Sequence, residues 1–233
     1  MLNIGINGGG IGGLAAAIAL QGAGHRVTIF EQASQFGRVG ADINLTPNAV
    51  RALDGLGVGD RLRETAAWPT ARISRAWDTG EQTSYLEMAG RAERDYGAPQ
   101  LTMHRADVIA ALEEAVAPDS LQLGRQTVAY EADASAATLV LADGSRHRFD
   151  LVVGADGIHS GLRRFLFGED HPQFTGIVSY RAVIPAERLP ELDLGAFLNA
   201  WGPSADLQIV RFPLYRWRDP CVSAPSPPPE RTQ

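Results

Sequence analysis

The sequence predicts an α/β fold, and three observations support this prediction. A short apolar stretch, a run of glycines, a helical segment and a second apolar stretch follow one another within the first 31 residues. That order and length are typical of one βαβ unit. Two hairpin patterns and several strand-like stretches come later, so we expect further β-structure. The chain of 233 residues is long enough to bury a core.

The first unit is defined by its boundaries. Residues 2–6 form a short apolar strand, and residues 12–21 form a helix that Gly22 and Gly24 end. Residues 26–30 form the next strand, directly before Glu31. We therefore predict a parallel strand–helix–strand arrangement at the start of the chain.

The remaining elements follow from periodicity and turn residues. Helices are predicted over 47–56, where a proline suits the first turn, and over 105–116, where apolar residues recur at helical spacing. Hairpins are predicted around 78–80 and around Asp143-Gly144. Further strands are expected at residues 151–153, 176–184 and 207–212.

Composition excludes several classes of function. The net charge of -6 argues against a nucleic-acid partner, because there is no basic excess to neutralise phosphates. The single cysteine, Cys221, excludes a disulfide framework and a cysteine metal site, and we expect no metal. Met1 leads into a strand without a basic segment, and no apolar run is long enough to span a membrane. We expect a cytoplasmic protein with no membrane partner.

The glycine run fits a dinucleotide-binding turn, Gly8-x-Gly10-x-x-Gly13. In such a turn Gly8 makes the tight bend, Gly10 lets a pyrophosphate approach the backbone, and Gly13 lets the helix pack close to the strand. The phosphates would lie at the N-terminus of the helix, where free N–H groups and the helix dipole favour anions. Together with the strand before it and the helix and strand after it, this turn predicts a Rossmann-like fold.

Glu31 stands 18 residues after Gly13, at the end of the second strand. A carboxylate there accepts hydrogen bonds from ribose hydroxyls and disfavours a 2′-phosphate, which predicts FAD or NAD rather than NADP. Gly5 and Asn7 are unusual in a buried strand, since a buried amide without a partner costs about 1–3 kcal/mol.

With these motifs the chain resembles the single-component FAD-dependent aromatic hydroxylases, the salicylate hydroxylase-like flavoprotein monooxygenases. The resemblance covers about residues 2–215. The segments that carry it, in chain order, are Gly8–Gly13, Glu31, Val39–Asn48, His104–Asp107, Gly154–Ser160 and Tyr180–Pro185.

The resemblance implies an FAD enzyme that uses NADH or NADPH and O2 to hydroxylate a small aromatic substrate, phenolic or benzoate-like. It implies that Gly12, Glu31 and Gln32 contact the ADP half of FAD. Arg105 would reach the flavin side, and Asp156 would belong to a motif linked to FAD and nicotinamide. It places Asn44 near flavin and substrate. No catalytic residue and no oligomeric state follow from it.

Simpler interpretations remain open for some of these residues. Arg105 would then be a solvated charge at the start of a helix, with His104 a bystander, and Asp156 would be a turn residue. His159 and Ser160 are expected to be helix-entry residues, because serine is a favoured N-cap.

Three departures from the family pattern bear on function. Gln208–Pro213 replaces an H-x-x-x-Y-P pattern, which removes groups that could act on a phenol proton. Asp42 replaces a glycine near the expected flavin and brings a carboxylate there. The third family motif, G-D-A-A-H-P, does not occur. We therefore expect a C-terminally truncated hydroxylase.

The resulting organisation is an FAD-binding domain, residues 1–70 and 98–170, with an incomplete β-rich substrate domain, residues 71–97 and 171–215. Residues 216–233, rich in proline, are predicted to be a disordered tail. Two alternatives to the hydroxylase remain. One is a non-catalytic remnant that binds FAD or ADP. The other is an NAD-dependent Rossmann dehydrogenase, which the Gly154–Ser160 stretch argues against.

Overall fold

The computed structural model describes residues 1–37, 42–169, 171–176, 178–189, 191, 195–202, 207–214 and 219–226. Packing divides the chain into two units. Unit 1 comprises Met1–Arg38, Leu56–Val58 and Val108–Pro172, and unit 2 comprises Val39–Gly55, Gly59–Asp107 and Gln173–Gln233. These units are defined by packing alone, so the predicted division into cofactor and substrate domains stays a prediction.

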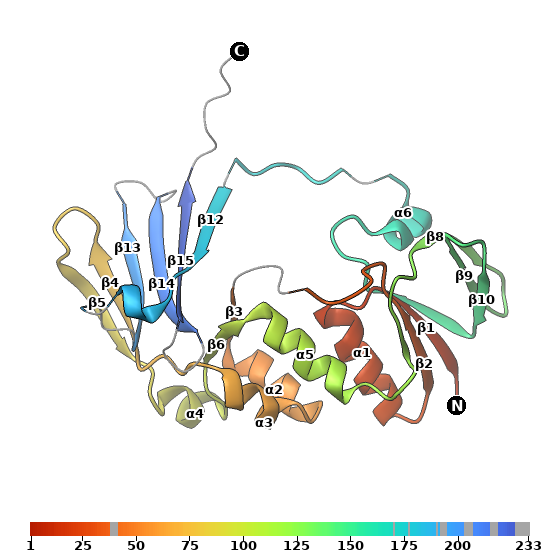
Figure 1. The fold of residues 1–233 in the computed structure, drawn as a ribbon, viewed down its shortest axis with the longest axis horizontal. Coiled ribbons are helices and arrows are strands. Elements are labelled where there is room, and N and C mark those ends of the chain that lie inside the picture. The colour runs from red at the N-terminus through yellow and green to blue at the C-terminus, as the bar shows by residue number, and fades with distance from the viewer. Residues whose placement is uncertain are drawn as a thin grey trace, which may run out of the picture. The chain divides into compact units, whose positions relative to one another are not determined.

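A parallel sheet forms the centre of unit 1, with the strand order β11-β1-β2-β7. Helix α1 follows β1 and leads back to β2 (Figure 1). It buries Leu14 and Ala17. This βαβ arrangement confirms the predicted α/β class. The elements of this sheet are β1 (Asn3–Asn7), α1 (Ile11–Gly22), β2 (Arg26–Phe30), β7 (Leu121–Gln122) and β11 (Leu151–Gly154).

An antiparallel sheet of three strands, in the order β10-β9-β8, completes unit 1 together with α6. The predicted Asp143-Gly144 hairpin joins β9 to β10, and Gly144 has the positive φ of +83° that favours glycine. The bounds are β8 (Thr127–Ala132), β9 (Ala137–Leu141), β10 (Arg146–Phe149) and α6 (Gly161–Phe167).

Phe149 explains the unusual Gly5. The Phe149 ring is buried with Phe30, Leu139 and Leu141 in one apolar cluster. A Cβ on Gly5 would lie 2.5 Å from Cδ2 of Phe149, so only a glycine in β1 leaves room for the ring. The cost of glycine in a strand is offset by the aromatic side chain that it accommodates.

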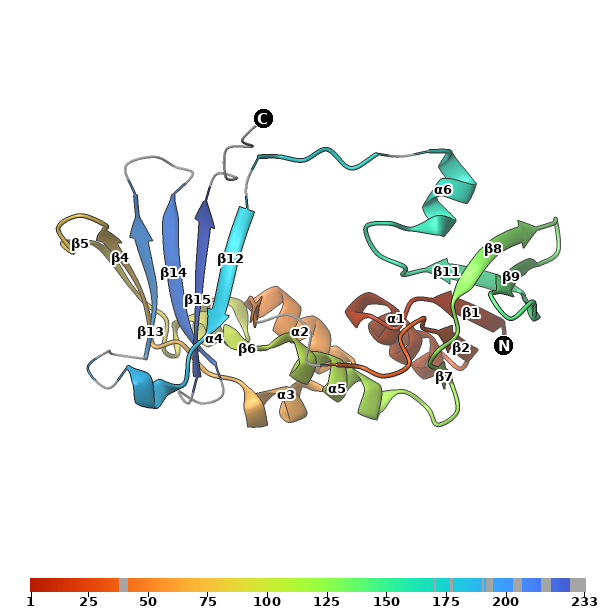
Figure 2. The same ribbon diagram turned by 45° about the horizontal axis from the view of Figure 1, so that its top comes forward.

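Unit 2 contains a sheet of six strands in the order β12-β15-β14-β13-β4-β5 (Figure 2). Only the β13–β4 pair is parallel, and the other four pairs are antiparallel. Its core includes the rings of Phe197 and Phe212, stacked with centroids 5.0 Å apart. The strands are β4 (Ala71–Ala76), β5 (Gln82–Glu87), β12 (Val178–Val183), β13 (Ala196–Trp201), β14 (Gln208–Leu214) and β15 (Asp219–Ser226).

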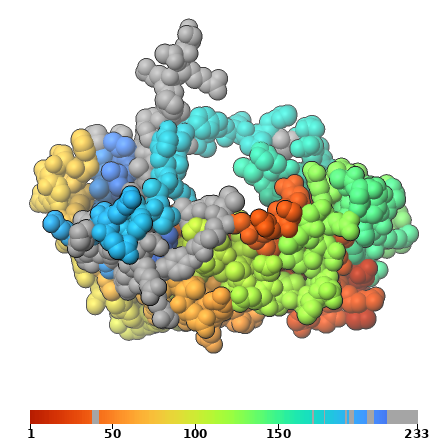
Figure 3. Space-filling model, viewed as in Figure 1, coloured from red at the N-terminus to blue at the C-terminus, as the bar shows by residue number. Residues whose placement is uncertain are grey.

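Two features of this sheet bear on the predictions. The predicted hairpin around 78–80 is confirmed as β4–β5, and every residue of β5 is exposed (yellow in Figure 3). The predicted disorder of residues 216–233 is wrong for 219–226, which form β15 between β12 and β14. Pairing on both sides supplies backbone hydrogen bonds without needing an apolar sequence pattern. Residues 215–218 and 227–233 lie outside the described residues.

Shorter elements complete unit 2. Strands β3 and β6 pair antiparallel, and an Asp54–Arg63 ion pair with an Oδ2–Nη2 distance of 2.9 Å joins α2 to α3. Helix α5 begins in unit 2 and ends in unit 1. The bounds are β3 (Asp42–Leu45), α2 (Pro47–Gly55), α3 (Gly59–Thr65), α4 (Arg91–Tyr96), β6 (Leu101–His104), α5 (Arg105–Ala115) and a 3-10 turn, η1 (Ala186–Arg188).

The variant Thr102→Val is expected to lower the free energy of unfolding by about 1–3 kcal/mol. The fully buried Thr102 hydroxyl donates to the carbonyl oxygen of Pro213 at 2.6 Å, which ties β6 to β14, and valine leaves that carbonyl without this donor. Urea unfolding measures the change. Thr83→Val, on the exposed strand β5, is the control and is expected to have little effect. Equal losses in both variants would contradict the assignment.

Candidate functional site

The glycine turn lies at the carboxyl end of β1, between β1 and α1. The Gly8 N–H donates to the Phe30 carbonyl at 2.8 Å, which ties the turn to the end of β2. Helix α1 begins after Gly10, which provides no side-chain cap, and its first turn has no acidic residue. The N-terminal N–H groups of α1 therefore face a position that favours an anion.

The glycines of this turn fall into two kinds. A Cβ on Gly8 would overlap the carbonyl oxygen of Ala155, and a Cβ on Gly13 would overlap the carbonyl oxygen of Gly8. Gly8 also has a φ of +107°. A Cβ on Gly10 or Gly12 would meet nothing within 4 Å. The first pair is thus required by the packing, while the second pair leaves open space at the helix N-terminus.

Glu31 lies directly beside the turn. Its Oε2 accepts a hydrogen bond from the Gly9 N–H at 2.7 Å, and its Oε1 accepts one from the Ala33 N–H at 2.9 Å. The carboxylate is therefore fixed by two backbone donors, and each oxygen keeps further acceptor capacity for a ribose hydroxyl. Gln32, the next residue, is exposed.

Asp156 caps helix α6 of unit 1. Its Oδ1 accepts from the Ser160 hydroxyl at 2.6 Å, and its Oδ2 accepts from the N–H groups of Gly161 and Leu162 at 2.8 and 3.2 Å. Ser160 is the N-cap of α6 and accepts from the Arg163 N–H, as predicted for a helix-entry serine. The position of Asp156 is thus that of a helix cap, and its contact with a cofactor stays a prediction.

The protonation of this cluster follows from its contacts. Burial raises the pKa of the Asp156 carboxyl, but hydrogen bonds from Ser160, the Leu162 N–H and Tyr130 outweigh it and hold the pKa below the ordinary value of 3.8. Burial raises the pKa of the Tyr130 phenol, and the charge of Asp156 raises it further. At neutral pH, Asp156 is therefore an anion and Tyr130 a proton donor.

Asn7 has the partner that the sequence did not reveal. The residue is 7% exposed, and its side-chain amide nitrogen donates to the Tyr130 hydroxyl at 2.6 Å. That hydroxyl donates to Oδ2 of Asp156 at 3.0 Å. The amide in the strand and the Gly154–Ser160 segment with Asp156 were the sequence signals of this network. Nothing in the sequence of β8 marks Tyr130 as its partner.

The other predicted site residues belong to unit 2. Asn44 on β3 is exposed and faces Thr102 of β6 in the strand register. Arg105 is the exposed first residue of α5, and the buried His104 accepts from the Ala106 N–H through Nδ1 at 3.1 Å. His104 therefore caps α5 beside Arg105. The cofactor role of Arg105 and the substrate role of Asn44 stay predictions.

The carboxylate of Asp42 has an ion-pair partner. Its side chain is 7% exposed, and its Oδ1 lies 3.2 Å from Nη1 of Arg181, whose side chain is 49% exposed. Arg181 belongs to the Tyr180–Pro185 segment on β12, so the structure brings together two segments that the resemblance singled out. The negative charge that replaces a glycine in β3 is balanced within unit 2. Residues 39–41 of the Val39–Asn48 motif lie outside the described residues.

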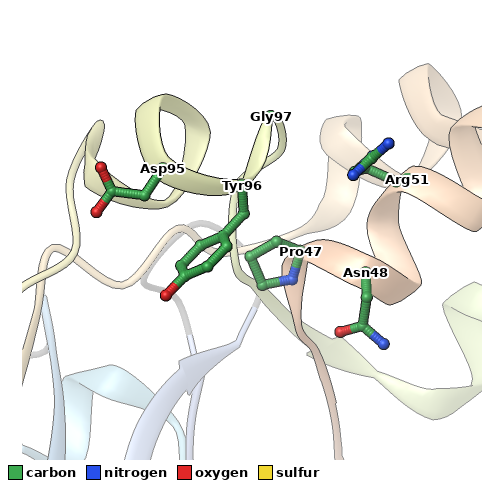
Figure 4. Close-up of a pocket in the computed structure, with 6 residues that line it drawn as sticks. All are labelled: Pro47, Asn48, Arg51, Asp95, Tyr96 and Gly97. Carbon is green, nitrogen blue, oxygen red and sulfur yellow. The ribbon is translucent and has the colours of Figure 1, made fainter.

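Unit 2 also has a cavity of about 760 Å³ between α2 and α4. Figure 4 shows the side chains around it, with Asn48 and Arg51 coming from α2 and Tyr96 from α4. Its volume lies in the range of cavities that hold small organic molecules. The residues lining it are Pro47, Asn48, Arg51, Asp95, Tyr96 and Gly97.

Two structural signals, a membrane-spanning helix and a metal-binding cluster, are absent from the described residues. No helix among them combines the length and the apolar character of a bilayer crossing. Within the same ranges, no group of three or more His, Cys, Asp or Glu side chains could hold a metal ion.

The chain matches a family model described as "FAD binding domain" over residues 1–205. It is 36% identical over 182 residues to 6-hydroxynicotinate 3-monooxygenase of Bordetella bronchiseptica, covering 78% of this chain and 48% of that protein. It is 36% identical over 199 residues to a salicylate hydroxylase of Pseudomonas putida, covering 82% of this chain and 45% of that one.

Solved structures agree with these matches. The HpxO structure of Klebsiella pneumoniae complexed with FAD and uric acid has a TM-score of 0.86 and 25% sequence identity, and the match covers 98% of this chain and 57% of that chain. The chain thus spans about half the length of the curated relatives that it matches.

Proposed function

Because the chain belongs to the FAD-binding domain family of flavoprotein monooxygenases, we propose that it binds FAD through the glycine turn of unit 1. The observation that carries the proposal is the open space at Gly10 and Gly12. A pyrophosphate in this space would meet backbone N–H groups at the start of a helix without a side-chain cap.

The residues present fit the ADP half of this cofactor. The pyrophosphate turn would be formed by Gly8, Gly10, Gly12 and Gly13. Glu31 would accept hydrogen bonds from the adenosine ribose hydroxyls through the same carboxylate oxygens that accept from the Gly9 and Ala33 N–H groups. Gln32 is exposed beside Glu31 and would contact the same half. We assign Asp156 to the same region, since Ala155 contacts Gly8.

For the whole protein we propose hydroxylation of a small aromatic substrate, phenolic or benzoate-like, with NADH or NADPH and O2. Bound FAD would supply the redox and oxygen chemistry of the reaction. Arg105 is proposed to contact the flavin side, and Asn44 is proposed to contact the substrate. The monooxygenase relatives support this class of reaction over an NAD-dependent dehydrogenase.

The test of FAD binding is direct. The 233-residue chain is mixed with FAD, passed over a sizing column, and the flavin absorbance of the protein peak is recorded. About one flavin per chain is expected, and a colourless peak of folded protein would overturn the proposal. Phenol-stimulated NADH oxidation with a hydroxylated product then tests catalysis separately. Flavin binding without product would favour the non-catalytic FAD-binding remnant.

The variant Gly10→Ala is expected to weaken FAD binding by at least about tenfold, which is about 1.4 kcal/mol. The added methyl would occupy the open space where the pyrophosphate is proposed to lie, while the φ of −71° at Gly10 accommodates alanine. Titration of flavin fluorescence measures the dissociation constant. Gly22→Ala, at the other end of α1, also meets nothing within 4 Å and is the matched control. Equal affinity of both variants would contradict the assignment.

A further inference from the structure

We propose that Asn7 and Tyr130 are positioning residues of the cofactor site, which hold the turn at Gly154–Ser160 against the glycine turn. The inference rests on the proposed function, because it assigns to the two side chains an effect on FAD affinity. Neither side chain belongs to the motifs that define the family resemblance. One chain of hydrogen bonds runs from β1 through β8 to the start of α6.

Asn7 is the last residue of β1 and directly precedes the glycine turn. Its side chain is almost fully buried, where an amide without a partner is unfavourable. The Tyr130 hydroxyl accepts its hydrogen bond at 2.6 Å. The phenol of β8 is therefore anchored at the point where the chain enters the turn.

Tyr130 also binds the second turn, at Gly154–Ser160. The Tyr130 hydroxyl donates its single proton to Oδ2 of Asp156 at 3.0 Å. A lone pair of the same hydroxyl oxygen accepts the hydrogen bond from the Asn7 side-chain amide. The ring packs against Phe165 of α6 with centroids 6.0 Å apart. A Cβ on Gly161 would lie 3.1 Å from the phenol oxygen, so this glycine leaves the space that the hydroxyl uses.

Asp156 and the glycine turn are joined through Ala155. The Ala155 N–H donates to the Asn7 carbonyl at 2.8 Å, and its carbonyl oxygen occupies the position that a Cβ on Gly8 would need. Its own Cβ lies 3.3 Å from the Cβ position of Gly13. A displacement of Asp156 therefore moves the neighbouring Ala155, which contacts both Gly8 and Gly13. Loss of the phenol hydroxyl is expected to loosen both turns together.

The experiment uses the full chain and FAD as the probe. Tyr130→Phe removes only the hydroxyl, and Tyr85→Phe on the exposed strand β5 is the matched control. Tyr130→Phe is expected to raise the dissociation constant of FAD about tenfold, while the control stays within about twofold. The double variant Asn7→Val/Tyr130→Phe is expected to bind no more weakly than Tyr130→Phe alone, because Asn7 acts through the phenol.

Amide hydrogen exchange of the protein without FAD provides a second readout. The N–H groups of Gly161 and Leu162 donate hydrogen bonds to Asp156. Their amide hydrogens are expected to exchange about tenfold faster in Tyr130→Phe than in wild type or Tyr85→Phe. A merely structural role of Tyr130 would lower stability but leave the FAD affinity of the folded protein unchanged.

The outcomes separate the two proposals. If wild type binds FAD and folded Tyr130→Phe binds it equally well, the positioning role is overturned and the proposed function stands. If folded wild type binds no FAD, both are overturned, whatever the exchange rates show. If the double variant binds FAD more weakly than Tyr130→Phe alone, the proposal that Asn7 acts through Tyr130 is also overturned. If variants of Asn7 do not fold, the comparison of Tyr130→Phe with Tyr85→Phe decides alone.

Discussion

Replacing Gly13 by alanine is expected to lower the free energy of unfolding by about 3 kcal/mol. The new Cβ would overlap the carbonyl oxygen of Gly8, and Ala155 also lies beside it. The neighbouring atom is backbone within a tight turn, so α1 must move away from β1 to make room. This movement would separate the helix N-terminus from the turn, and FAD binding is expected to weaken with it.

Urea unfolding of Gly13→Ala beside Gly22→Ala tests this expectation. Both substitutions add one methyl to helix α1, but the Cβ at Gly22 meets nothing within 4 Å. Gly22→Ala is expected to be neutral or up to about 1 kcal/mol more stable, since alanine loses less backbone entropy than glycine in a helix. If Gly13→Ala is as stable as Gly22→Ala, the packing around Gly13 does not require a glycine.

The second large effect is expected at Asp156. Asp156→Ala removes the acceptor of four hydrogen bonds, from the hydroxyls of Tyr130 and Ser160 and from two backbone N–H groups of α6. Donors that are left partly buried without an acceptor cost about 1–3 kcal/mol each, although Ser160 can turn to water. We expect a total loss of about 3 kcal/mol of unfolding free energy.

The control for Asp156 is Asp60→Ala in the first turn of α3. The Asp60 side chain is fully exposed and approaches Arg63 only at 4.0 Å. Its removal is expected to cost less than about 1 kcal/mol, the usual value for a carboxylate at a helix N-terminus. Chemical denaturation of both variants at pH 7 measures the difference. Equal losses would contradict the capping role of Asp156.

The lowered pKa of Asp156 also predicts a pH dependence. Because its carboxyl binds a proton less readily in the folded chain than in the unfolded chain, its contribution to stability is complete above the ordinary carboxyl pKa of 3.8. That contribution is lost as the pH falls through the lower pKa of the folded chain. The stability difference between wild type and Asp156→Ala should therefore shrink with acidification. A difference independent of pH would contradict the pKa assignment.

Local signals in the sequence predicted much of unit 1. The glycine turn, the helix that follows it and the strand before Glu31 were predicted within one or two residues, because turn residues and apolar periodicity act over short distances. The Asp143-Gly144 hairpin was predicted for the same reason. Ser160 was identified as a helix-entry residue because N-caps have a strong residue preference.

Contacts between distant segments could not be predicted in this way. The partner of Asn7 is a tyrosine 123 residues later, and nothing local to either strand signals that they meet. The pairing of Asp42 with Arg181 spans 139 residues. Strand β15 could not be predicted because its prolines argue against a strand, and only the two distant strands that flank it supply its pairing.

The two kinds of glycine in the turn have different consequences for the history of this chain. Gly8 and Gly13 are held by the architecture itself, so selection for a folded unit 1 retains them whether or not a cofactor is ever bound. Gly10 and Gly12 carry no such constraint. In a lineage that had lost cofactor binding, random substitution would replace these two first and spare the other two. Whether Gly10 and Gly12 are kept in descendants of this gene therefore indicates whether the cofactor site is still used.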